Sequence, residues 1–269
     1  MLNHGHVAVN ASRHQPTSRL HVISAGVAAM RLTYERSIVR RGERSAFMRP
    51  TYCTYTQGRV MVADELQNCI HVVEAGSGNV TRDASHPPLT MLPVDRIEGA
   101  LGATEEETAA LRFCYPTGVA TDGVHLYVAD SLNYRLQKLR LSDLASLGCT
   151  GSRGGGDNQF KGPQGLALAG SLLFVADFWS HRVLVYDTQL QFIRSFGTEG
   201  NGRGELCKPT GVAVHTRAAG PFFVADQLEV LVADSGNGRV QVSLTISPCR
   251  ERHPASSRWH VRRTLWSIT

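Results

Sequence analysis

Hydrophobic residues in this chain fall into short runs separated by turn-forming residues. The clearest example lies between Phe160 and Gly197, where the runs LALA, LLFVA, RVLVY and FIRSF follow one another. Runs of four or five residues rich in Val, Leu and Phe predict β-strands rather than helices. We therefore predict four antiparallel strands joined by tight turns. Such a small sheet cannot bury both faces alone, so it needs copies of itself.

The same pattern recurs along the chain. The motif Phe-x-x-Pro ends at Pro50, Pro116 and Pro163, and Leu206-x-x-Pro209 is a near match, so successive prolines are 66, 47 and 46 residues apart. In the first three units the Val of a Val-Ala-Asp sequence follows 12 residues after the proline, whereas the last unit needs 23 and carries an insertion. A fixed internal spacing with variable links indicates repeated β units.

Each remaining unit has its own predicted strands. A weaker first unit would place them at Val7–Val9, Leu20–Ile23, Met30–Tyr34 and Ser37–Arg40. In the later units we expect strands at Val60–Ala63, Ile70–Val73, Val94–Gly99, Gly118–Thr121, Leu126–Ala129, Leu136–Leu141, Gly211–Val214, Phe222–Asp226 and Val230–Asp234. The expected organisation is a weak first unit or N-terminal extension at 1–46, the repeats at 47–247, and a basic tail or last outer strand at 248–269, with that strand at His260–Ser267.

A polar motif, Asp-x-x-Asn/Ser-x-Arg, follows most of the Val-Ala-Asp sequences. It occurs as Asp130-x-x-Asn133-x-Arg135, Asp177-x-x-Ser180-x-Arg182 and Asp234-x-x-Asn237-x-Arg239. Asp and Asn side chains hydrogen-bond nearby backbone in turns, and an Arg five positions later can return across the hairpin to the Asp. The motif therefore predicts a structural turn first and direct ligand contact second. At Asp64 the Arg is replaced by Cys69, so Asp64 should lack that partner.

The order of these motifs resembles the NHL repeat. Pro-x-Gly-Val-Ala, Val-Ala-Asp, Asn-x-Arg-Val-Gln, Phe-Gly and a glycine-rich link match it over about residues 42–245, most closely over 113–245. The resemblance implies an all-β propeller, usually of six four-stranded blades. Four clear units and a weaker fifth are present, so we expect an incomplete or a six-bladed ring. The resemblance also implies protein partners, including substrates of ubiquitin ligases, or RNA.

Net charge ranks these partners. The overall charge is +5, but residues 100–249 are slightly acidic and the basic excess lies near the termini. Binding to nucleic acid requires clustered cations, so we expect a protein partner first, RNA second, and no DNA. The start of the chain lacks a secretory signal and no run is long enough to cross a membrane, so we expect an intracellular, cytoplasmic protein. Six scattered cysteines without a CxxC pair predict small buried side chains and no structural zinc site.

Enzymatic function is not expected. The run Gly197–Gly204 precedes a strand rather than a helix, so it is interpreted as a link between blades and not a phosphate loop. His181 matches one turn histidine of the zinc-dependent peptidyl-amidoglycolate lyases, which have a similar propeller, but the equivalent positions hold Asn68, Tyr134 and Gly238. A catalytic zinc needs about three protein ligands. We therefore expect no metal, no cofactor and no catalytic residues, with a metal-dependent propeller enzyme as the third alternative.

One turn carries unusual side chains. Phe178 and Trp179 stand where the sister turns have Ser131-Leu132 and Ser235-Gly236. Exposed aromatic residues with Arg are typical of binding hot spots; the alternative is that the rings pack on a neighbouring loop. The strand order predicts that these turns share a face with the glycine-rich links. The candidate partner-binding residues are Phe178, Trp179, His181, Arg182, Tyr134, Arg135 and Arg239.

Overall fold

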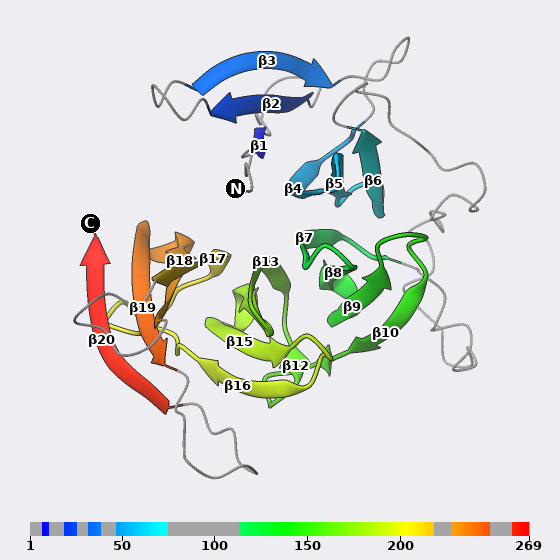
Figure 1. Cartoon of the computed structure of the whole chain (residues 1–269). Coiled ribbons are helices and arrows are strands. Elements are labelled where there is room, and N and C mark those ends of the chain that lie inside the picture. The colour runs from blue at the N-terminus through cyan, green and yellow to red at the C-terminus, as the bar shows by residue number, and fades with distance from the viewer. Residues whose placement is uncertain are drawn as a thin grey trace, which may run out of the picture. The chain divides into compact units, whose positions relative to one another are not determined.

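The structure is a computed structural model of the whole chain (Figure 1), and it describes residues 7–10, 19–25, 32–38, 47–74, 113–217, 227–247 and 260–268. The described elements are β-strands and single turns of 3-10 helix. None of the helices in these ranges is long and apolar enough to cross a lipid bilayer. The chain divides into two compact units, Met1–Cys149 and Thr150–Thr269.

The first unit contains two three-stranded sheets and one four-stranded sheet among its described residues. In each sheet, strands that are consecutive in the chain are also neighbours in space. The first sheet consists of β1 (Val7–Asn10), β2 (Arg19–Ala25) and β3 (Leu32–Ile38). The second consists of β4 (Pro50–Thr56), β5 (Arg59–Asp64) and β6 (Cys69–Glu74). The third consists of β7 (Pro116–Thr121), β8 (His125–Asp130), β9 (Arg135–Arg140) and β10 (Ser146–Thr150).

The second unit contains two four-stranded antiparallel sheets. One consists of β13 (Pro163–Ala169), β14 (Leu172–Asp177), β15 (Arg182–Asp187) and β16 (Phe192–Phe196). The other consists of β17 (Pro209–Arg217), β18 (Gln227–Asp234), β19 (Arg239–Ser247) and β20 (His260–Ile268). A short parallel pair, β11 (Ser152–Arg153) with β12 (Gln159–Phe160), precedes the first of them.

Most strand predictions are confirmed. The four runs between Phe160 and Gly197 form β13 to β16, and the C-terminal segment forms β20, which pairs with β19. Two predicted strands, Met30–Tyr34 and Ser37–Arg40, are wrong because one strand, β3, replaces them. The two residues between the predicted strands, Glu35 and Arg36, do not favour a turn, so the chain stays extended through them. The sequence missed β10, while Val94–Gly99 and Phe222–Asp226 lie outside the described residues.

The predicted burial of the cysteines is also wrong for the five that the structure describes. Cys53, Cys69, Cys114 and Cys207 are only half-buried and Cys149 is exposed, and none of these five cysteines forms a disulfide. Cys149 lies on the outer strand β10, where the residues before it are also exposed. A thiol placed on an outer strand stays in contact with solvent even when its neighbours in sequence are apolar.

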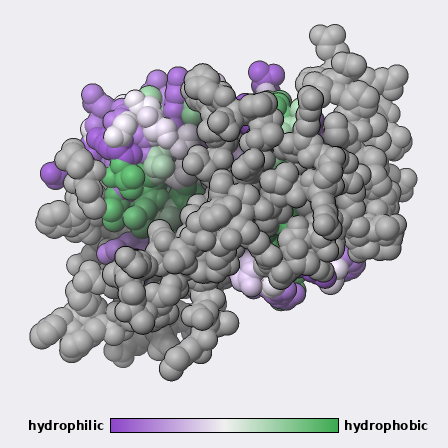
Figure 2. Space-filling view, turned by 90° about the horizontal axis from the view of Figure 1, so that it is seen from above, coloured by the Kyte–Doolittle hydropathy of each residue, from purple (hydrophilic) through white to green (hydrophobic). Residues whose placement is uncertain are grey.

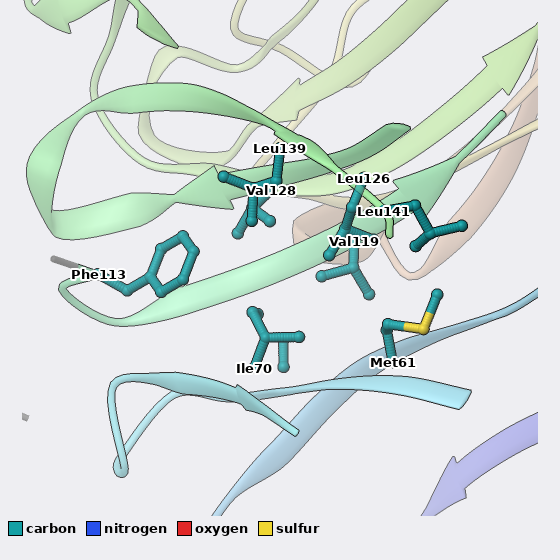
Figure 3. Close-up of a cluster of buried hydrophobic side chains, with 9 residues drawn as sticks. Met61, Ile70, Phe113, Val119, Leu126, Val128, Leu139 and Leu141 are labelled. Carbon is teal, nitrogen blue, oxygen red and sulfur yellow. The ribbon is translucent and has the colours of Figure 1, made fainter. Parts of the chain in front are cut away.

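The core of the first unit lies between the sheet β4–β6 and the sheet β7–β10 (Figure 3). Met61 and Ile70 point from the first sheet towards Val119 and Leu126 on the second, and Phe113 closes the cluster beside Ile70. Each fully buried side chain of this size contributes roughly 1.5–3 kcal/mol relative to an exposed one. Packing of one sheet face on the next therefore stabilises sheets that could not exist alone.

The aromatic residue of each Phe-x-x-Pro motif belongs to these cores. Phe47, Phe113 and Phe160 are 1%, 7% and 0% exposed, and Leu206 of the near match is 2% exposed. In the second unit Leu206 packs between residues of β14, β15 and β18. The repeated motif therefore anchors the link that precedes each sheet, and Leu fills the position as well as Phe does.

Candidate functional site

The turn after each Val-Ala-Asp sequence is one turn of 3-10 helix in three sheets. These are η2 (Ser131–Asn133), η3 (Phe178–Ser180) and η4 (Ser235–Asn237). The next residue adopts the left-handed conformation, with φ of 55° at Tyr134, 54° at His181 and 63° at Gly238. This conformation costs a residue other than glycine roughly 1–2 kcal/mol, so interactions around the turn must hold it.

A buried aspartate supplies those interactions. Asp130 is fully buried and accepts hydrogen bonds from Asn133 Nδ2 at 2.9 Å, Arg135 Nε at 2.8 Å and Gln137 Nε2 at 2.8 Å. It also accepts one from the backbone N–H of Cys114 at 2.7 Å. The expected return of the Arg across the hairpin is therefore present. One carboxylate ties the turn, the next strand and the Phe-x-x-Pro segment together.

Asp234 repeats this arrangement in the second unit. It accepts hydrogen bonds from Asn237 Nδ2 at 2.9 Å, Arg239 Nε at 2.8 Å, Gln241 Nε2 at 3.0 Å and the Cys207 N–H at 2.6 Å. Burial opposes the charged form of Asp234, but these hydrogen bonds outweigh it and hold its pKa below the ordinary value. Fully satisfied polar networks of this kind fix a single local structure.

The glycine-rich link is bound to the same turn. Arg239 also donates to the backbone carbonyls of Asn201 at 2.6 Å, Gly202 at 2.8 Å and Glu205 at 3.0 Å. The link leads into β17 and not into a helix, which confirms its interpretation as a connection between sheets. Within the second unit, the turns and the glycine-rich links therefore lie on one face, as predicted.

Asp177 is held less tightly. It accepts the N–H groups of Lys161 at 3.0 Å and Gly162 at 2.8 Å, but Arg182 Nε lies 3.8 Å from it. Arg182 instead donates to the carbonyls of Gly156 at 2.8 Å and Gln159 at 2.9 Å. Burial is the largest influence on Asp177 and raises its pKa.

Trp179 is the most exposed part of the second unit's aromatic turn, with 56% of its surface accessible. Its ring meets Phe178 edge to face with centroids 4.8 Å apart, and Lys208 Nζ lies 5.1 Å from its centroid. Trp179 also covers Gly162, where a Cβ atom would lie only 2.9 Å from Trp179 Cδ1. The ring therefore packs on a neighbouring loop and presents more than half of its surface to solvent. We call Phe178, Trp179 and Lys208 the Trp179 tip.

His181 fixes Lys208. Its Nδ1 accepts the backbone N–H of Lys208 at 3.3 Å, and its Nε2 lies 3.9 Å from Glu199 Oε1. The described part of the chain contains no group of three His, Cys, Asp or Glu side chains that could hold a metal ion. Here the imidazole holds a loop, and that loop carries the lysine beside the tryptophan.

Of the seven predicted binding residues, only Trp179 is exposed, and the other six are partly buried. The side chains of Arg135, Arg182 and Arg239 are 13%, 12% and 16% exposed and face aspartates of their own turns. Tyr134 and Arg135 lie in the first unit, while the remaining candidates lie in the second. Sequence reasoning missed Lys208, whose signal was its place directly before Pro209 in a chain with three lysines.

The middle residue of the turn is apolar and exposed in other sheets too. Leu66 and Leu132, at the positions that correspond to Trp179, are 45% and 47% exposed. Figure 2 shows one face of the molecule, on which hydrophobic areas of the described residues lie beside hydrophilic ones. Trp179 differs from its counterparts in size and in its lysine neighbour, which makes its turn the distinctive one.

Comparison with known proteins gives a limited sequence match. No protein-family model matches the chain. A segment is 36% identical over 85 residues to the RING finger protein nhl-1 of Caenorhabditis elegans, covering 31% of this chain and 8% of that protein. The match therefore spans less than a tenth of that relative's length.

Solved structures support the fold. The chain is similar to one in a nidogen/laminin complex, with a TM-score of 0.50 and 15% identity over 85% of this chain and 68% of that one. A hydrazine synthase from Kuenenia stuttgartiensis gives a TM-score of 0.44 with 13% identity over 85% of this chain and 66% of that one. Together with the serial four-stranded antiparallel sheets, the fold class is all-β, of the β-propeller type, and each sheet corresponds to a blade.

Proposed function

We propose that this protein is a non-catalytic scaffold of the NHL type that binds a protein partner through the Trp179 tip. The observation that carries the proposal is a tryptophan that is 56% exposed and yet fixed on two sides. Tryptophan is enriched among residues that dominate binding energy at interfaces. Because the Trp179 ring is already held in place, binding of a partner over it would cost little side-chain entropy at this residue.

Similarity to nhl-1 supports the repeat type and suggests a cellular context. That relative is named as a RING finger protein, and a propeller in such a setting can select the substrate of a ubiquitin ligase. We include this role in the proposal, together with an intracellular location, which imaging of a tagged chain would test. The engaged arginines and buried aspartates of the turns support a structural and not a catalytic use of these polar groups.

RNA is a second candidate for the same surface. Aromatic rings beside a cation stack on single-stranded bases, and Lys208 lies over the ring of Trp179. Glu199, which lies beside His181 on the same face, has a side chain that is 77% exposed. A negatively charged carboxylate at this place would repel the phosphate backbone of RNA, so a protein partner remains the first choice.

The test is a crosslinking pull-down read for both protein and RNA. Trp179→Ala should lose its partners, whereas Leu132→Ala, which truncates the matching exposed residue of another turn, should retain them. We expect a loss of about 2 kcal/mol or more in binding, the usual level for a hot-spot residue. Retention of the same protein partners by a folded Trp179→Ala variant would refute the site, and loss of RNA alone would favour the second candidate.

A further inference from the structure

The turn at Asp64 differs from its counterparts in its polar partners. Where Asp130 is followed by Arg135 and Gln137, both bonded to it, Asp64 is followed at the same spacings by Cys69 and His71. Asp64 is still fully buried. A buried carboxylate therefore lies beside a thiol and an imidazole in place of a guanidinium and an amide.

The thiol and the carboxylate both approach the same nitrogen atom of the imidazole. Cys69 and His71 are two residues apart on β6, so their side chains leave the same face of the strand. Cys69 Sγ lies 3.4 Å from His71 Nε2, and the same Nε2 lies 3.7 Å from Asp64 Oδ2. The ring of Phe47 packs edge-on against the imidazole with centroids 5.0 Å apart, and the His71 side chain is only 10% exposed. The thiol itself is half-buried.

We propose that Cys69 and His71 form a site of thiol modification, at which Cys69 makes a mixed disulfide with a small, uncharged disulfide. In the tautomer with its hydrogen on Nδ1, neutral His71 accepts the thiol proton at Nε2, and the new N–H then faces the Asp64 carboxylate 3.7 Å away. The thiolate attacks one sulfur of the reagent, a new S–S bond forms as the old one breaks, and the leaving thiolate takes the proton from the imidazolium. One protein thiol and one disulfide thus become one mixed disulfide and one small thiol, with no other reactant.

The surrounding charges suit this chemistry. Burial opposes the charged form of Asp64, but hydrogen bonds from backbone N–H groups, including those of Met48 and Arg49, help to hold its pKa below the ordinary value. The carboxylate therefore stays negative and stabilises an imidazolium beside it. Glu65 and Arg49, the other charged groups at this corner, pair with each other. The negative aspartate disfavours anionic reagents, and for this reason the ligand class is an uncharged disulfide.

Two other thiols of the chain serve as internal controls. Cys53 lies on β4 of the same sheet, and burial raises its pKa to about 11, so it should stay protonated at neutral pH. Cys149 is exposed and reports the effect of accessibility alone. If the pH dependence of the modification rate of Cys69 differs from that of both control thiols, the difference gives the contribution of the imidazole.

The experiment treats the full chain with 2-hydroxyethyl disulfide at several pH values and measures the modification of each cysteine by mass spectrometry. An ordinary thiol is about 1% ionised at pH 6.5. Full ionisation would raise the rate of disulfide exchange at pH 6.5 about a hundredfold. The lower nucleophilicity of a stabilised thiolate would reduce this gain to about tenfold. We therefore expect the Cys69 rate to fall much less than the Cys149 rate between pH 9 and pH 6.5.

A matched variant removes the base and keeps the turn. His71→Gln introduces the residue found at this position in two sister turns, where it donates to the buried aspartate. It should slow Cys69 about tenfold at pH 6.5 and little at pH 9, since base assistance matters only while the thiol is protonated. Parallel pH profiles of Cys69 and Cys149 in the wild-type chain would overturn the proposal, as would an unchanged Cys69 rate in His71→Gln. The wild-type comparison decides the question if the variant does not fold.

Discussion

Removal of the buried carboxylate at Asp130 should be among the most destabilising single changes in the first unit. Asp130→Ala would leave four donors without their acceptor, one of them the guanidinium of Arg135, whose Nε lies 2.8 Å from the carboxylate. Breaking a buried ion pair by removing one partner typically costs about 3–5 kcal/mol. Each neutral donor left unpaired in the interior adds a cost of roughly 1 kcal/mol or more unless water reaches it. We therefore expect a loss of at least about 4 kcal/mol in the free energy of unfolding, the middle of the range for the ion pair alone.

The assay is urea unfolding followed by circular dichroism, with Asp143→Ala as the matched control. Asp143 also pairs with an Arg, since Arg140 NH1 lies 2.7 Å from its Oδ2, but both side chains are well exposed. Its removal should leave the unfolding midpoint unchanged within error. A loss below about 1 kcal/mol for Asp130→Ala, the level of an exposed pair, would refute the idea that this carboxylate organises its turn.

Two further predictions concern the second unit. Gly162→Ala should displace the ring of Trp179, because the new Cβ would lie 2.9 Å from Trp179 Cδ1. The fluorescence emission of Trp179, recorded in a chain with Trp259 and Trp266 replaced by Phe, should then shift. An unchanged spectrum would contradict the packing of Trp179 on Gly162. The two aspartates should respond to pH with opposite signs. Because the folded-state pKa of Asp234 is lowered from 3.8, its contribution to stability is complete above that value and is lost as pH falls through the folded pKa. The pKa of Asp177 is raised from 3.8, so its contribution is greatest at low pH and falls as pH rises through the window above 3.8. Urea unfolding between pH 3 and 6 should show a cost that shrinks towards low pH for Asp234→Asn and grows for Asp177→Asn; slopes of the same sign would refute the assignment.

The fold was predictable from sequence because its signals are local. A strand needs only a short alternation, and the pairing of Asp130 with Arg135 needs only a fixed spacing of five residues across one hairpin. The bond from Gln137 was missed because a glutamine inside a strand gives no signal of its own partner. The period of two along a strand could have placed Cys69 beside His71, but the absence of an adjacent CxxC or triad pattern hid the pair.

The rest depended on contacts distant in sequence. Lys208 meets Trp179 across 29 residues and two sheets, and composition alone does not bring them together. The degree of exposure of Cys149 followed from the position of β10 as an outer strand, which was not predicted. The two short strands expected near Tyr34 and Ser37 merged because nothing in the sequence between them favours a turn.

The turns described above separate the residues that hold the backbone from the residue that the backbone displays. The buried aspartate fixes the course of the chain, while the middle position of the turn holds Leu66, Leu132 and Trp179 in three sheets. A substitution at that middle position changes the surface and leaves the scaffold intact. New binding preferences could therefore evolve, or be engineered, by varying one residue in each turn, with little cost to folding.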